Sequence, residues 1–92
     1  MSRPLPESVP QLRPGCRLSD APGQGAVLMI PEGALELAGP GPRILELCDG
    51  RRCFAELVKE LQGLYPGVDA SLISEEAGTF LERLRDRRIL EY

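Results

Sequence analysis

The chain has 92 residues, a length that suits a single domain with a modest hydrophobic core. Its 11 Lys and Arg residues are outnumbered by 14 Asp and Glu residues, and the resulting net charge of −3 argues against a general affinity for nucleic acid. The chain contains no His, so it lacks the commonest acid–base group and the commonest metal ligand.

Residues 1–11 are polar and carry three prolines, which predicts a flexible, extended arm ahead of one domain at residues 12–92. The arm has no apolar stretch typical of a signal peptide. Nowhere does the chain approach the roughly 18 apolar residues of a membrane span. We therefore expect a cytoplasmic protein that makes no membrane contact.

Three short segments with the hydrophobic pattern of strands follow the arm. The first is clearest at residues 16–18, where apolar and polar residues alternate. The second, AVLMI at residues 26–30, is wholly apolar, and the third, ALEL at residues 34–37, puts two leucines on one face. Turns rich in Gly and Pro separate the segments, so the pattern predicts a three-stranded antiparallel meander.

The hydrophobic period then changes to that of a helix. A first helix of two to three turns is expected to begin in the GPGP run at residues 39–42 and to end near Gly50, which suits a left-handed backbone. A second begins at Cys53, where Glu56 completes the pattern of a capping box, and the Tyr-Pro-Gly sequence at residues 65–67 ends it.

A third, longer helix is expected after a cap at Asp69 or Ser71, and it should end near residues 87–88. Ile89 and Leu90 then return to the core. Three strands followed by three helices indicate an α+β fold. The order also suits a winged helix-turn-helix-like domain whose sheet forms an N-terminal wing.

Several strings in the chain resemble one known family. They are the PEG turn at residues 31–33 with the apolar run before it, ILELCDG at residues 44–50, and FLxxL at residues 80–84. Together they resemble PqqD, the pyrroloquinoline quinone (PQQ) biosynthesis protein D family, over residues 12–90. That resemblance implies a winged-helix-like peptide chaperone, one of the recognition elements for ribosomally made, modified peptides (RiPPs).

By this resemblance, the chain would bind the precursor peptide PqqA and present it to PqqE, the radical S-adenosylmethionine (SAM) enzyme that crosslinks a Glu and a Tyr of that peptide. It implies no cofactor in this chain, because the iron–sulfur chemistry would belong to PqqE. The peptide would add beside the third strand, in a groove against the third helix. The implied peptide-binding residues are Ala34, Leu35, Glu36, Leu37, Glu76, Thr79, Arg83 and Arg87.

One local sequence departs from the family pattern. Members usually carry a polar residue and then Thr-Ala just before the first helix, whereas this chain has Ala38 and then Pro40-Gly41. We therefore expect this helix to begin without a side-chain cap. The resemblance also suggests Leu35→Pro as a test, because proline removes a backbone donor from the third strand.

The sequence is also compatible with other interpretations. Leu35 and Leu37 could be core residues only, and the charged flank of the last helix could be a solvated face. A winged-helix DNA-binding domain or another protein-interaction domain is the main alternative, although Lys59 is the only basic residue in the second helix. The chain could be a monomer, or a homodimer joined through the same strand edge or the arm.

Catalysis and metal binding are not expected. The sequence shows no nucleophile elbow and no phosphate-binding loop. Its three cysteines, Cys16, Cys48 and Cys53, include no CxxC pair, so we expect buried thiols in a reducing compartment and no zinc site.

Overall fold

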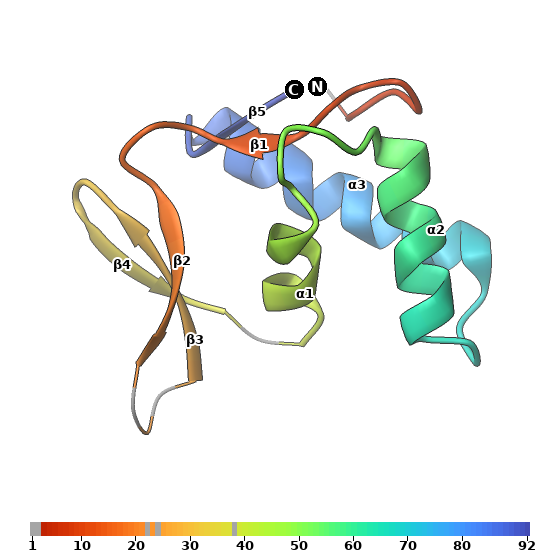
Figure 1. Cartoon of the computed structure of the whole chain (residues 1–92), viewed down its shortest axis with the longest axis horizontal. Helices are drawn as coiled ribbons and strands as arrows, with labels where there is room; N and C mark the ends of the chain where they lie inside the picture. The colour runs from red at the N-terminus through yellow and green to blue at the C-terminus, as the bar shows by residue number, and fades with distance from the viewer. Residues whose placement is uncertain (1–2, 22, 24, 38) are drawn as a thin grey trace.

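A computed structural model describes residues 3–21, 23, 25–37 and 39–92 of the chain. A sheet stands to one side of a group of helices, with α1 lying between the sheet and α2 (Figure 1). The elements in chain order are β1 (Gln11–Leu12), β2 (Arg17–Ala21), β3 (Gly25–Ile30), β4 (Gly33–Glu36), α1 (Gly41–Glu46), α2 (Phe54–Leu64), α3 (Ala70–Asp86) and β5 (Leu90–Glu91).

The main sheet is the expected three-stranded antiparallel meander, with strand order β2-β3-β4. Leu28 of β3 is opposite Leu18 of β2 and Leu35 of β4, and it is fully buried. Because side chains alternate between the two faces of a strand, this row of leucines marks the face that packs on the helices. The α+β fold predicted from the order of strands and helices is confirmed.

Helix α1 begins without a side-chain cap, as predicted: Pro40 occupies the N-cap and makes no side-chain hydrogen bond. The helix is shorter than expected, because the N–H groups of Leu47 and Cys48 donate to carbonyls only three residues back, which tightens the last turn. Gly50 has the expected left-handed backbone (φ +76°), but it lies in the following loop and donates its N–H to Pro10 O at 3.2 Å.

Helices α2 and α3 begin and end where the sequence predicts. The Cys53 N–H donates to Glu56 Oε1 at 2.9 Å, which completes one half of a capping box. That hydrogen bond holds the pKa of Glu56 below its ordinary value. Asp69 caps α3 by accepting from the Ser71 N–H at 2.8 Å, and the Ser71 hydrogen bonds lower the pKa of Asp69.

A second, two-stranded sheet was not predicted. Gln11 pairs with Glu91 and Leu12 with Leu90, so β1 and β5 bring the two ends of the domain together. Leu90 is 1% exposed, which confirms that the C-terminal segment returns to the core. Strands of two residues carry too little periodicity to be recognised from sequence.

The described part of the N-terminal arm, residues 3–10, lies against the helices, although the sequence predicted a flexible segment. Ser8 O accepts the Phe54 N–H at 2.7 Å and Pro6 O accepts the Ala55 N–H at 3.0 Å. The arm therefore supplies acceptors for N–H groups that the first turn of α2 leaves unpaired. Pro4 is buried. The division into an arm and a domain stays a prediction.

The core lies mainly among the helices. Fully buried leucines come from each layer of the domain: Leu28 from β3, Leu57 and Leu61 from α2, Leu81 from α3 and Leu90 from β5. Within the described part of the chain, no helix is both long enough and apolar enough to cross a bilayer.

Candidate functional site: an open strand edge beside a charged helix flank

Strand β4 is an edge strand of the main sheet, and no other strand among the described residues pairs with its outer side. The Leu37 N–H donates to Ala26 O across from it at 3.3 Å, so residues 37 and 26 form a hydrogen-bonded pair. Such pairs alternate along an antiparallel ladder, and Leu35 therefore also directs its backbone groups toward β3. The N–H and C=O groups of Ala34 and Glu36 must then point outward, toward the open edge.

The side chains of this segment follow the same alternation. Leu35 and Leu37 are partly buried against the core, whereas Ala34 and Glu36 are exposed. The Leu35 side chain thus faces the interior, and its backbone N–H and C=O groups face β3. A proline at position 35 would break the sheet itself, so the structure makes Ala34 the better position for testing the open edge.

A groove of about 420 Å³ runs between the start of α1 and the flank of α3. It brings together three of the residues that the resemblance implies, Glu76, Thr79 and Arg83. Gly41 lies on the α1 side, where an added Cβ would be 3.4 Å from the Phe80 ring and 3.9 Å from Leu37 Cβ. Because Leu37 directly follows β4, the groove begins where the open edge of the sheet ends.

The other implied residues do not line this groove. Ala34, Leu35 and Glu36 lie on the strand, and Arg87 is the exposed C-cap of α3. The implied residues therefore lie on two elements, β4 and the flank of α3, which meet near Leu37. On β4, Ala34 and Glu36 face the open edge, whereas Leu35 faces the core and β3.

Charge is divided along the α3 flank. Glu75 and Glu76 lie in the N-terminal half of the helix, and Arg83 and Arg87 lie at its C-terminal end. Among the described residues the ion pairs are Arg43–Glu46 and Arg52–Asp49, and neither involves this flank. Glu75, Glu76, Arg83 and Arg87 of the flank therefore form no ion pair within the described part of the chain.

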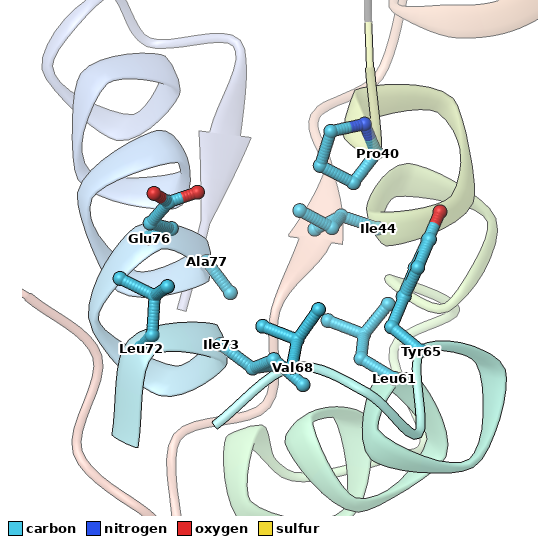
Figure 2. A pocket seen from close by; sticks show the side chains of 9 residues that line it. All are labelled: Pro40, Ile44, Leu61, Tyr65, Val68, Leu72, Ile73, Glu76 and Ala77. Atoms are coloured by element: carbon cyan, nitrogen blue, oxygen red, sulfur yellow. The ribbon is translucent and has the colours of Figure 1, made fainter. Parts of the chain in front are cut away.

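A second, apolar cavity of about 210 Å³ adjoins the groove, and it was not predicted from the sequence. In Figure 2, Leu72 and Glu76 of α3 lie across the opening from Pro40 and Ile44, with Leu61, Tyr65 and Val68 below. Val68 and Leu72 fall outside the buried helical stripes and are 41% and 48% exposed. Apolar residues left off those stripes were the signal that could have identified it.

The described residues offer little reactive chemistry. None of them form a group of three or more His, Cys, Asp or Glu side chains that could hold a metal ion. The Cys48 thiol donates to Ile44 O at 3.3 Å, and burial, together with the nearby charge of Asp49, raises the pKa of this thiol to about 12. The arrangement is that of a binding surface with an open strand edge, a charged flank and an apolar cavity.

Comparison with known proteins gives consistent results. Residues 25–90 match the family model described as coenzyme PQQ synthesis protein D (PqqD). The PqqA binding protein of Pseudomonas paraeruginosa (strain PA7) is 43% identical over 89% of this chain and 88% of its own length. The PqqA binding protein of Stutzerimonas stutzeri (strain A1501) is 36% identical over 90% and 89%.

Among solved structures, a similar one is the PqqD truncation of Methylobacterium extorquens PqqCD, determined by solution NMR and described as a functional and stand-alone RiPP recognition element. It superposes with a TM-score of 0.77 and 29% sequence identity, over 91% of this chain and 89% of the other.

Proposed function

The chain belongs to the PqqD family, and from this membership we propose that it is a peptide chaperone of PQQ biosynthesis that binds the precursor peptide PqqA. In this proposal PqqA adds to β4 as a further strand, and the complex is presented to the radical SAM enzyme PqqE. The observation that carries the proposal is the open edge of β4, where the outward backbone groups of Ala34 and Glu36 have no strand partner in the part of the chain that the structure describes.

Backbone hydrogen bonds would supply only part of the affinity. Each contributes about 0.5–1.5 kcal/mol net, whereas micromolar binding needs about 8 kcal/mol. Side-chain contacts along the α3 flank must provide the remainder. They would also provide selectivity, since the backbone of any extended peptide can pair with a strand edge.

The DNA-binding alternative has less support. The α3 flank carries Glu75 and Glu76 beside Arg83, and these carboxylates would repel phosphates. The named relatives are peptide-binding proteins, which also favours a recognition role over a catalytic one. In the proposal the chemistry on PqqA belongs to PqqE.

A homodimer formed by pairing two β4 edges would use the same backbone groups that the peptide needs. Peptide binding and this form of dimerisation would then compete. Sedimentation with and without PqqA distinguishes a monomer from such a dimer, because only the dimer would lose mass when the peptide is added.

The test is a calorimetric titration of synthetic PqqA into the wild type, Ala34→Pro and Ala34→Val. Proline removes the outward N–H and leaves the β3–β4 ladder intact, so we expect affinity to fall by roughly two- to tenfold, the factor that one net hydrogen bond represents. Valine keeps the N–H and should bind as the wild type does. Equal affinity for wild type and folded Ala34→Pro would rule out strand addition at this residue.

Presentation is tested separately. PqqE is supplied with PqqA and either wild-type protein or Ala34→Pro at a concentration where only the wild type is saturated. We expect more crosslinking with the wild type. Crosslinking that proceeds equally without this chain would contradict the presentation step while leaving peptide binding intact.

A further inference from the structure

The apolar cavity between α1, α2 and α3 has features of a binding site for a side chain. Its walls include Tyr65, Val68 and Leu72, which are 37%, 41% and 48% exposed. Large apolar side chains gathered at one opening usually mark an interaction site. An engineered cavity of about 150 Å³ with aliphatic and aromatic walls binds benzene. At about 210 Å³, this cavity has room for a leucine or an aromatic side chain.

The cavity is continuous with the groove proposed above for the peptide. Both are lined by Pro40, Ile44, Leu72 and Glu76. Gly41, which lines the groove, also lies beside Leu37, the residue after β4: a Cβ added at Gly41 would be 3.9 Å from Leu37 Cβ. A peptide that leaves the edge of β4 along α3 would therefore pass the groove and arrive at the cavity.

We propose that this cavity anchors one apolar side chain, leucine or aromatic, of the same peptide that adds to β4. The inference rests on the proposed function and names a specificity pocket for it. The size of the cavity favours a single side chain as occupant. A second copy of the chain would need an interface of about 1,200 Å² or more, far larger than this opening.

Charged side chains on the α3 flank indicate which peptide groups would lie near the anchored apolar residue. The Glu76 carboxylate lies at the opening, across from Pro40, and makes no ion pair among the described residues (Figure 2). It suits a basic side chain or a backbone N–H next to the anchored residue. Arg83, at the other end of the groove, suits a carboxylate of the peptide.

Helix α3 sets the distance between the apolar cavity, at Leu72, and Arg83. Leu72 and Arg83 are about 16 Å apart along α3, at about 1.5 Å per residue. An extended peptide covers that length in about five residues, at about 3.3 Å each. The ligand class is therefore an extended peptide with an apolar residue about five positions from an acidic one.

The experiment compares two exposed leucines that differ in position. Leu72 lines the cavity, whereas Leu64 lines neither the cavity nor the groove, and each is 48% exposed. Synthetic PqqA is titrated into wild type, Leu72→Ser and Leu64→Ser, with thermal melting of each variant as the folding control. We expect Leu72→Ser to lose about tenfold or more in affinity and Leu64→Ser to match the wild type.

A series of PqqA peptides, each with one apolar residue changed to Ser, identifies the anchored residue. One of these peptides should bind the wild type about as weakly as unchanged PqqA binds Leu72→Ser. That same peptide should bind Leu72→Ser no more weakly than it binds the wild type, because the contact is already lost. Additive losses for every peptide would overturn the proposal.

Three other outcomes are also decisive. Equal affinity of wild type and Leu72→Ser for PqqA would rule out binding of a side chain in the cavity, but it would not contradict strand addition at β4. A failure of the wild type itself to bind PqqA would contradict the proposed function and the anchor together. A dimer that Leu72→Ser dissociates, with peptide affinity unchanged, would show that the cavity joins two copies of the chain.

Discussion

The helical region and the three-stranded sheet of this domain are built in different ways. The helices supply most of the buried side chains, among them Leu57, Leu61 and Leu81. The main sheet contributes Val27 and Leu28 as buried side chains, and its outer strand β4 has none. Because a fully buried leucine contributes about 1.5–3 kcal/mol, stability should reside in the helices, and the sheet is left free to bind.

The largest expected effect tests this division directly. Leu81→Ala would remove a fully buried side chain from α3 and should lower the free energy of unfolding by about 2–5 kcal/mol. Leu35→Ala, in the partly buried strand β4, should cost less than about 2 kcal/mol. Urea denaturation followed by circular dichroism measures both, and equal losses would show that the sheet stabilises the domain as much as the helices do.

Gly50 lies in the loop after α1 and is hydrogen-bonded to Pro10 of the N-terminal segment. Replacing it should have the next largest effect on the unfolding free energy. Gly50→Ala would place a methyl group against the Gln11 side-chain oxygen, at a residue with φ +76°. We expect a loss of about 1–3 kcal/mol in unfolding free energy.

The matched control is Gly63→Ala in α2, where an added Cβ meets no atom within 4 Å. That variant should gain about 0.5–1 kcal/mol, because alanine is the better helix former. If both glycines tolerate alanine equally, the loop at Gly50 does not depend on its left-handed backbone.

A gain in stability is expected at the end of α3. Arg88 has a left-handed backbone (φ +61°), and the N–H groups of Arg88 and Ile89 donate back to Arg85 O and Leu84 O at 2.9 Å each. This pattern is a Schellman motif, in which glycine is the usual residue. Arg88→Gly should raise the unfolding free energy by about 1 kcal/mol. Arg87→Gly, at a right-handed residue, should bring no gain, and a gain there would contradict the explanation.

The smallest effect is expected from acid. Hydrogen bonds at the helix starts lower the pKa of Glu56 and Asp69 from ordinary values of 4.5 and 3.8. A lowered folded-state pKa adds stability above the ordinary value, and this stability is lost as the pH falls through the lowered one. Thermal melting between pH 7 and pH 2 should show that loss. Glu56→Gln and Asp69→Asn should each reduce it, whereas an unchanged pH profile would count against these caps.

The sequence predicted the elements with strong periodicity and missed those that depend on distant contacts. Helix α2 was recognisable because its apolar residues recur at helical spacing and Tyr65-Pro66 ends it. The β1–β5 pair was not, since two residues carry no period. The course of residues 3–10 also depends on contacts far along the chain, such as the hydrogen bond from Arg3 Nη2 to Thr79 Oγ1 at 2.7 Å.

The same difference applies to the candidate site. Family resemblance pointed to residues 34–37 and the α3 flank, but it could not say which backbone groups face outward. That required the register of β4 against β3 and the hydrogen bond between Leu37 and Ala26. The apolar cavity depends on three helices meeting, so no single segment of the sequence revealed it.

Amide hydrogen exchange in β4, with and without PqqA, tests the central claim most directly. The amides of Leu35 and Leu37 face β3 and should be protected in both states, whereas those of Ala34 and Glu36 should exchange fast in the free protein. We predict that saturating PqqA slows exchange at Ala34 and Glu36 by tenfold or more. Unchanged exchange at both residues, with PqqA bound, would contradict strand addition at this edge.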